Sequence, residues 1–162
     1  MKTKIIPFTL AAFAVIAIVW FAFSSESKSY AKLHTVVPMP DSTINWDSMD
    51  FDAKKGYMKA VVMPHMKALF VVFDSAKYSE IKCKTCHGEG VASGTYKMPN
   101  PRLPKLPKTA EGFKALMDKH PDMMKFMGGT VKPEMAKLLG LKQYNKDNPT
   151  GFGCGNCHTQ EE

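Results

Sequence analysis

Two short stretches of the sequence carry residues whose types and spacing can do chemistry. All four cysteines lie in two Cys-x-x-Cys-His motifs, at residues 83–87 and 154–158. The two-residue gap brings two thiols together, and the histidine that follows adds a nitrogen ligand. This pattern is typical of covalent haem c attachment, in which the thiols bind the two vinyl groups and the histidine binds the iron.

The motifs therefore predict two covalently bound haem c groups. The thiols would come from the four cysteines, Cys83, Cys86, Cys154 and Cys157. The proximal iron ligands would be His87 and His158. Zinc is the alternative, because paired Cys-x-x-Cys units also form tetrahedral sulfur sites. The separation of the pairs, the histidine after each pair and the export signal described below favour haem.

A second axial ligand for each iron is expected upstream, because only four residues follow the second motif. The segment VMPHMKAL at 62–69 matches VKPEMAKL at 131–138 in four of eight positions. This internal repeat predicts Met66 as the distal ligand of the first haem and Met135 as that of the second. His/Met ligation raises the reduction potential relative to His/His and keeps both irons six-coordinate, which suits electron transfer.

Other readings of these methionines stay open. A methionine on the apolar face of a helix is more often core filler than a ligand. Five other methionines compete for the role: Met63, Met98, Met123, Met124 and Met127. His65, beside Met66, is a further candidate, although Glu134 stands at its equivalent position in the repeat. His34 and His120 are expected to face solvent.

Helices are expected to position these residues. Apolar spacing predicts a helix that begins near Pro64 and carries Met66. A second helix is predicted from a Thr109 cap to residue 120, followed by a turn or two that end at Gly128 and Gly129. A third helix is predicted over 133–140.

The fold class follows from these elements. The proline-rich segment 97–108 is predicted to run extended over the surface, because its prolines are incompatible with a helix or a central strand. Strand signals are weak throughout. The sequence therefore predicts a mostly α fold, a small dihaem domain with long loops.

The N-terminal residues differ from the rest of the chain. Residues 5–23 are uncharged and apolar, and Lys2 and Lys4 precede them. As a helix this run would be about 28 Å long, close to the roughly 30 Å thickness of membrane hydrocarbon. This length favours a membrane-spanning anchor, with a cleaved secretory signal as the alternative. The lysines predict a cytoplasmic N-terminus, with everything after residue 24 outside the cytoplasm.

Three regions are therefore expected: a membrane anchor or uncleaved signal at 1–24, a tether at 25–56, and a dihaem cytochrome c domain at 57–162. The net charge of +7 is scattered along the chain. It argues against nucleic acid as a partner and suits the steering of an acidic redox protein.

The repeated unit resembles a known family. A helix bearing methionine, a turn, and a helix entered through C-x-x-C-H is the repeating unit of the tetrahaem cytochrome subunit of bacterial photosynthetic reaction centres and its dihaem relatives. The chain resembles two such units, "PHM…CKTCH" and "PEM…CGNCH", over residues 62–158. The resemblance implies pseudo-twofold haem packing and a role as an electron relay. The longer proline-rich insert departs from the family's pattern and leaves the close approach of the haems open.

Other cytochrome classes fit less well. Single-haem class I cytochromes c place their methionine ligand well downstream of the attachment site, and class II cytochromes match the second half only.

The expected function is that of a membrane-tethered dihaem c-type cytochrome on the periplasmic side of a bacterial cytoplasmic membrane. It would transfer single electrons between a membrane respiratory or photosynthetic complex and a terminal acceptor, and no catalytic residue is expected. The alternatives are a dihaem peroxidase-like enzyme and a haem-based sensor, each with one open iron site. The sequence shows neither an acid/base pair that can be placed beside an iron nor a signalling domain.

Overall fold

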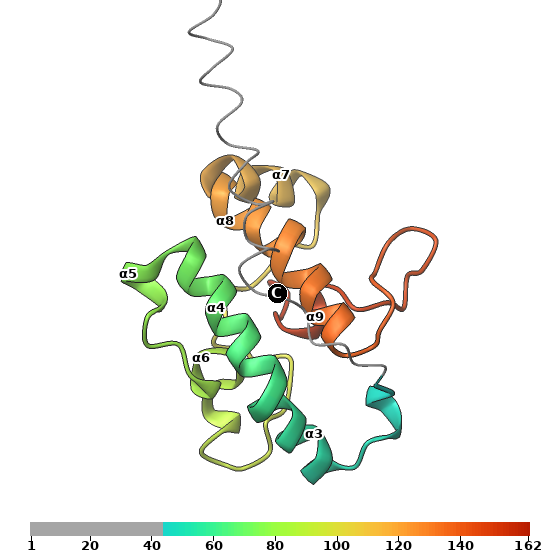
Figure 1. Cartoon of the computed structure of the whole chain (residues 1–162). Coiled ribbons are helices and arrows are strands. Elements are labelled where there is room, and N and C mark those ends of the chain that lie inside the picture. Colours follow the sequence, from blue (N-terminus) through green and yellow to red (C-terminus); the bar gives the residue numbers. More distant parts are fainter. Residues whose placement is uncertain (1–43) are drawn as a thin grey trace, which may run out of the picture. The chain divides into compact units, whose positions relative to one another are not determined.

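The computed structural model describes residues 44–162 (Figure 1). The chain divides into two units, Met1–Pro38 and Met39–Glu162, and all the described residues belong to the second unit. The anchor predicted at 1–24 and most of the predicted tether lie outside the described residues. Between residues 44 and 162, no helix is both long and apolar enough to cross a membrane.

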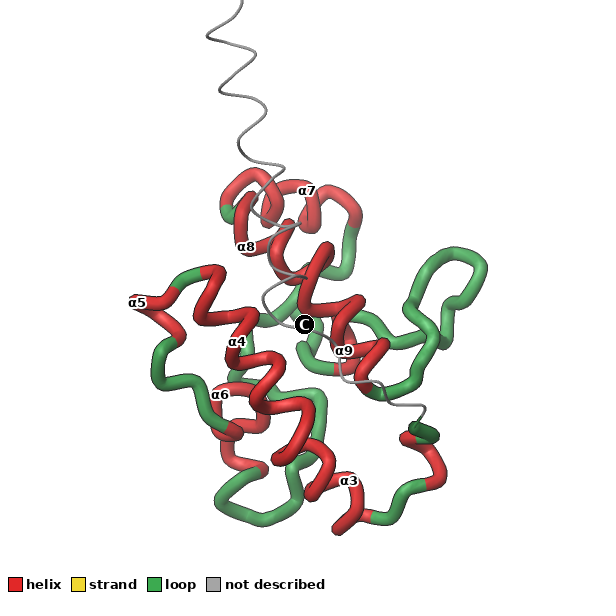
Figure 2. The backbone as a smooth tube through the Cα atoms, in the orientation of Figure 1, coloured by secondary structure: helices red, strands yellow, loops and turns green. Residues whose placement is uncertain are grey.

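The described part of the chain consists of helices joined by long loops (Figure 2). It contains isolated β-bridges but no strand, so the predicted mostly α fold is confirmed. The elements are η1 (Trp46–Ser48), α3 (Phe51–Tyr57), η2 (Met58–Val62), α4 (Met63–Phe73), α5 (Ser75–Tyr78), α6 (Cys83–His87), η3 (Gly88–Gly90), α7 (Ala110–Lys119), α8 (Pro121–Phe126), η4 (Met127–Val131), α9 (Lys132–Leu138) and η5 (Cys154–Asn156).

The first long helical segment runs without a break through α3, η2 and α4. The Asp50 carboxylate caps it by accepting a hydrogen bond from the Ala53 backbone N–H at 2.8 Å. The prediction that this helix begins near Pro64 is wrong, because the helix begins at Phe51. Proline normally removes a helical hydrogen bond and clashes with the preceding turn. Here the π-helical turn η2 lies directly before α4 and widens the helix at that point.

The second long helical segment has the same construction. It runs through α8, the π-helical turn η4 and α9. The prediction that a helix ends at Gly128 and Gly129 is wrong, because both glycines lie inside η4. Pro133 follows η4 as Pro64 follows η2, so each proline stands at the second position after a π turn. The helix predicted over 133–140 is therefore the continuation of an earlier one.

The ends of the other predicted helices agree with the sequence. The Thr109 hydroxyl caps α7 by accepting a hydrogen bond from the Gly112 N–H at 3.1 Å, and α7 ends before Pro121. Beyond α9, Gly140 has a φ of +64°. A side chain there would collide with the backbone carbonyl of Ile44, so the position requires glycine.

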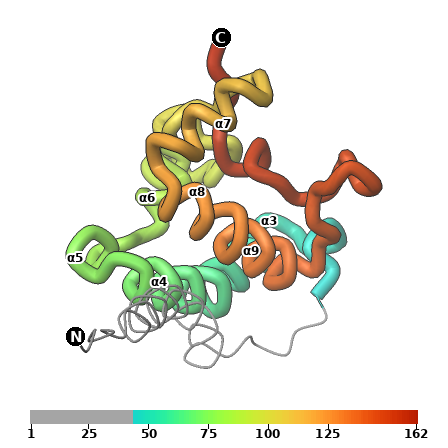
Figure 3. The backbone as a smooth tube through the Cα atoms, turned by 90° about the horizontal axis from the view of Figure 1, so that it is seen from above, coloured from blue at the N-terminus to red at the C-terminus, as the bar shows by residue number. Residues whose placement is uncertain are grey.

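The two long helical segments lie side by side and run in opposite directions (Figure 3). Phe126, at the start of the second segment, is fully buried against the end of the first. Its ring stacks on Phe73 with centroids 4.1 Å apart and meets Phe70 edge-on at 5.1 Å. At the opposite end, the Tyr57 hydroxyl donates a hydrogen bond to the Leu138 carbonyl at 2.8 Å. Burial of a side chain such as Phe126 contributes about 1.5–3 kcal/mol.

The proline-rich segment 97–108 forms neither helix nor strand, as predicted, but its predicted place on the surface is only partly correct. Asn100 and Leu106 are buried. The Leu106 N–H donates to the Thr159 carbonyl at 2.8 Å, and the Leu106 carbonyl accepts from the Glu161 N–H at 2.9 Å. The segment therefore packs against the residues that follow the second Cys-x-x-Cys-His motif.

Candidate haem attachment sites

The first motif forms the short helix α6. Before it, the Asp74 carboxylate caps α5 by accepting from the Lys77 N–H at 3.0 Å, and the chain then continues into α6. The Lys82 N–H donates to the Thr85 hydroxyl at 3.0 Å at the start of α6. One helical turn places Cys83 and Cys86 on the same face, because residues three apart are neighbours on a helix. Both thiols can therefore reach one bound group.

The second motif forms the 3-10 turn η5. It follows the loop 141–153, which is held by a bridge between Gln143 and Phe152. The Asn156 side-chain carbonyl accepts from the Gly153 N–H at 2.7 Å, and the Cys157 N–H donates to the Cys154 carbonyl at 3.1 Å. This tighter turn again gives the two thiols the same spacing of three residues.

All four cysteines are free thiols. Cys154 is exposed, whereas the other three are partly buried. Burial, followed by the charge of Cys83, raises the pKa of the Cys86 thiol. Burial also raises the pKa of Cys157 to about 11, with smaller effects from the charges of Cys86 and Cys154. The second cysteines of the two motifs are thus close enough to influence one another electrostatically.

Both motif histidines are oriented by a backbone carbonyl. His87 Nδ1 lies 3.0 Å from the Tyr96 carbonyl, and His158 Nδ1 lies 2.9 Å from the Pro104 carbonyl. A carbonyl can only accept, so Nδ1 carries the proton in each ring and Nε2 keeps its lone pair. Metal-binding histidines usually show this arrangement, because the second hydrogen bond fixes the tautomer and the ring orientation.

The charge state of His87 also suits metal binding. Burial lowers the pKa of His87, and the hydrogen bond to the Tyr96 carbonyl opposes this with a smaller effect. The lowered pKa favours the neutral ring, which is the form that binds a metal.

The predicted distal ligands occupy equivalent places in the two long segments. Met66 lies on α4 and Met135 on α9, each in the first helical turns after a π turn. Among the residues that the structure describes, Met66 is the one buried methionine, at 7% exposure. Met135 is half-buried, as are its five predicted competitors. Burial therefore distinguishes Met66 but not Met135.

A buried pair that the sequence did not predict joins the two segments at their centre. His65 Nε2 lies 3.0 Å from Glu134 Oε2, and both side chains are buried. The two residues are 69 apart and are equivalent in the repeat. Because the two segments run antiparallel (Figure 3), a contact between equivalent residues at their centre is compatible with a local twofold axis between the segments. The signal in the sequence was the pairing of a base with an acid at one repeat position.

This contact also bears on the role of His65. Its Nε2 atom is bound to the Glu134 carboxylate, which leaves the adjacent Met66 as the better candidate ligand. His120 is exposed at the end of α7, as predicted.

The donor atoms of each motif fit a haem. Each motif offers two thiols and one oriented imidazole on a single short turn, and the macrocycle brings its own nitrogens to the iron. Thr159, directly after His158, has a buried hydroxyl without a hydrogen-bond partner in the described part of the chain. A polar group at the edge of a bound cofactor would satisfy it. Within residues 44–162, no three His, Cys, Asp or Glu side chains gather into a metal-binding group.

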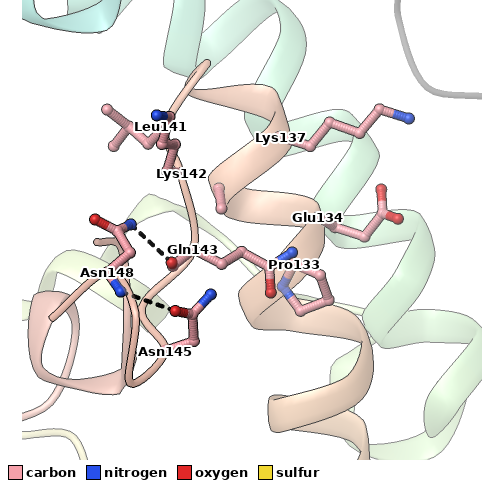
Figure 4. Close-up of a pocket in the computed structure, with 9 residues that line it drawn as sticks. Pro133, Glu134, Lys137, Leu141, Lys142, Gln143, Asn145 and Asn148 are labelled. Carbon is pink, nitrogen blue, oxygen red and sulfur yellow. Dashed lines mark hydrogen bonds between the residues drawn. The ribbon is translucent and has the colours of Figure 1, made fainter. Parts of the chain in front are cut away.

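An open pocket of about 500 Å³ lies between α9 and the loop 141–148 (Figure 4). Asn148 closes one side of it by donating from Nδ2 to the Gln143 carbonyl at 2.9 Å. Its other lining residues include Glu134 and Lys137. None of the predicted thiol, histidine or methionine ligands lines this pocket, so it is separate from the candidate haem sites.

Comparisons of the chain with protein-family models, with curated proteins and with solved structures found no match. The function of the chain is therefore inferred from its two motifs and from the geometry around them.

Proposed function

We propose that the chain is a dihaem c-type cytochrome that carries single electrons. The observation that best supports this function is the hydrogen bond from Nδ1 of each motif histidine to a backbone carbonyl. Two histidines on different turns, 71 residues apart in the sequence, are both held by Nδ1, and neither Nε2 has a hydrogen-bond partner within residues 44–162. One such histidine could arise by chance, but the same arrangement at both supports the proposal that they share a role as metal ligands.

The residues would divide the work as follows. Cys83 and Cys86 hold one haem by thioether bonds, and His87 is its proximal ligand. In the second site the thiols belong to Cys154 and Cys157, and His158 is the proximal ligand. Each haem, when bound, supplies one-electron chemistry at its iron. The protein supplies the iron ligands, orients each haem and excludes water from it.

The distal ligands in this proposal are Met66 and Met135. Each methionine would give its haem iron a second protein ligand beside the histidine, and His/Met ligation would suit one-electron transfer. The common construction of the two long helical segments supports this assignment. Each segment has a π turn, a proline two residues later and a methionine two residues after that. Single π turns inside helices are frequently found at functional sites.

The proposed domain consists of two units related by a local twofold axis, each with a methionine-bearing helix and a Cys-x-x-Cys-His motif. The contact between His65 and Glu134, which are equivalent in the repeat, supports such an axis. So does the placement of Phe126 and Tyr57, which are also equivalent in the repeat, at opposite ends of the contact between the two segments. This arrangement would let an electron pass through the molecule by way of two haems.

The proposed place of action is the periplasmic side of a bacterial cytoplasmic membrane, with residues 1–24 as the anchor. The partners would be a membrane respiratory or photosynthetic complex and a terminal acceptor. Segment 97–108 has four basic and no acidic residues, and all four are exposed: Lys97, Arg102, Lys105 and Lys108. Because the same segment binds His158, it would present positive charge beside a haem and steer an acidic redox protein toward it.

A peroxidase-like enzyme or a haem-based sensor is the second candidate. The observation in its favour is the half-buried state of Met135, which does not distinguish it from nearby methionines. If Met135 were not a ligand, the iron bound to His158 would have an open position. That haem would then bind peroxide or a gas, while the His87 haem would remain a carrier.

The test is expression of the full chain in a host that attaches haem c, followed by intact mass and absorption spectroscopy. We expect a mass increase of two haems. The double variant Cys154→Ser/Cys157→Ser should keep one haem. Both reduced haems of the unaltered chain should resist carbon monoxide. A chain with no covalent haem would contradict the proposal, and one carbon monoxide complex per molecule would favour the second candidate.

A further inference from the structure

One residue of the proline-rich segment contacts both motifs. Asn100 is buried, with 4% of its surface exposed, although most of its neighbours in the segment are exposed. Its side-chain Nδ2 donates a hydrogen bond to the Cys86 carbonyl at 2.9 Å. Its backbone N–H donates to the Cys157 carbonyl at 3.0 Å. Asn100 therefore bridges the two Cys-x-x-Cys-His motifs.

The two acceptors are equivalent atoms. Cys86 and Cys157 are both the second cysteine of their motif, and each directly precedes the motif histidine. Asn100 thus holds the same carbonyl in each motif, once by its side chain and once by its backbone.

The carbonyls that orient the histidines flank Asn100 symmetrically. Tyr96, four residues before it, accepts from His87, and Pro104, four residues after it, accepts from His158. We name residues 96–104 the clasp. A single stretch of nine residues therefore supplies the second hydrogen bond for both histidines.

The centre of the clasp is firmly held. Asn100 Oδ1 accepts from the Arg102 N–H at 3.0 Å, and the Asn100 carbonyl accepts from the Leu103 N–H at 3.2 Å. Gly88, directly after His87, allows Asn100 to approach the first motif. A methyl group added at Gly88 would lie 2.7 Å from Asn100 Oδ1, and the φ of Gly88 is +55°.

We propose that Asn100 is a positioning residue shared by both haem sites, and that the clasp couples them. This inference rests on the proposed function, because it assumes that His87 and His158 bind iron. Asn100 would act through the two histidines and would not touch either iron. A strong Nδ1–H hydrogen bond makes the imidazole a better electron donor and so favours the ferric state. Loosening the clasp would weaken this bond at both histidines together.

The first test is the variant Asn100→Ala in the full, haem-loaded chain. We expect the midpoint potentials of both haems to rise, and the histidine signals of both haems to shift in paramagnetic proton NMR spectra. The single-haem variant Cys154→Ser/Cys157→Ser assigns the signals to the two sites. Asn148→Ala is the matched control, since Asn148 Nδ2 also donates to a backbone carbonyl but Asn148 has no hydrogen bond to either motif. It should leave both potentials unchanged.

The second test leaves residue 100 as asparagine and shifts its side chain by a substitution in a neighbouring residue. Gly88→Ala pushes a methyl group against the Asn100 side chain from the first motif, and we expect the signals of the His158 haem to shift as well. Gly155→Ala is the control inside the second motif, because a methyl group there meets nothing within 4 Å. It should not change the His87 haem. If the Asn100→Ala variant does not fold with two haems attached, the Gly88→Ala variant tests whether the clasp couples the two sites.

The outcomes separate this inference from the proposed function. Attachment of no haem by the unaltered chain would overturn the proposed function and the clasp together. Attachment of two haems, with changes confined to the His87 haem in both variants, would overturn the clasp alone. Parallel shifts at both haems would support it.

Discussion

The first motif lies in an α-helix against a tyrosine ring, whereas the second lies in a 3-10 turn at the end of a long loop. The His87 ring meets the Tyr96 ring edge-on at 5.5 Å. Cys154 is exposed, and Met135 is less buried than Met66. The bond from Nδ1 to a carbonyl is nevertheless the same in both motifs. The comparison teaches that the hydrogen bond which would orient a proposed iron ligand is present in both halves, although the surroundings of the two motifs differ.

The two halves also differ where they meet. The position held by His65 in the first half is held by Glu134 in the second, and the two side chains bind each other. Two identical residues at this position would place like groups together. The difference between the halves is therefore what allows their central contact.

The largest expected effect comes from breaking this central contact. Replacing Glu134 or His65 alone by alanine leaves the other side chain buried without this partner, which should cost about 3–5 kcal/mol. Urea unfolding of the haem-loaded chain measures the loss of stability. The exchanged double variant His65→Glu/Glu134→His should recover most of it, because the proposed local twofold axis would make the two positions interchangeable. If the exchanged chain were as unstable as the single variants, the two positions would not be equivalent.

The next largest effect should distinguish the two methionines. Met66→Ala removes a buried side chain and should cost about 2–5 kcal/mol in the free energy of unfolding. Met135→Ala should cost less, because Met135 is only half-buried. Absorption spectra should show one high-spin haem in each variant.

The spectra separate ligand from core filler. A destabilised Met66→Ala variant with two low-spin haems would make Met66 a core residue only. Met117→Ala is the matched control, since Met117 is exposed on α7. It should change neither stability nor spectra.

A smaller effect is expected at the outer contacts of the two segments. Tyr57 in the first half corresponds to Phe126 in the second, and its hydroxyl donates to the Leu138 carbonyl. Tyr57→Phe makes the halves alike and should cost about 1 kcal/mol, the net value of one hydrogen bond. The measurement is again urea unfolding. A variant as stable as the unaltered chain would mean that the ring alone holds this end.

The smallest effect should be a gain in stability. Gly129 lies in the second π turn, where Ala60 occupies the equivalent position of the first. A methyl group at Gly129 meets nothing within 4 Å. Gly129→Ala should therefore stabilise the folded chain by about 0.5–1 kcal/mol, because glycine loses more backbone freedom inside a helix. A loss of stability would show that this π turn needs glycine.

Much of the fold followed from local signals in the sequence. The Thr109 cap and the end of α7 before Pro121 were predicted correctly, since both depend on neighbouring residues. The continuation of each long segment through its π turn was not. Pro64 and Gly128 normally mark helix boundaries, and nothing in their local pattern reveals a π turn that accommodates them.

The sequence was sufficient to predict the cysteines and histidines of the candidate site, but not the residues that hold them in place. The cysteines and histidines of both motifs stand out by spacing alone. The contact between His65 and Glu134 joins residues far apart in sequence, so no local pattern reports it. The role of Asn100 could not be predicted for another reason. Its segment has the composition of a solvated loop, and only the folded chain brings both motifs to it.

The most direct test of the central claim is near-infrared magnetic circular dichroism of the oxidised, haem-loaded chain, because the charge-transfer bands report the axial ligands of each iron. The two-unit account predicts bands of His/Met ligation only, with an intensity that corresponds to two haems. A high-spin or His/His component would contradict it at one site at least, and the Met66→Ala and Met135→Ala spectra would identify which.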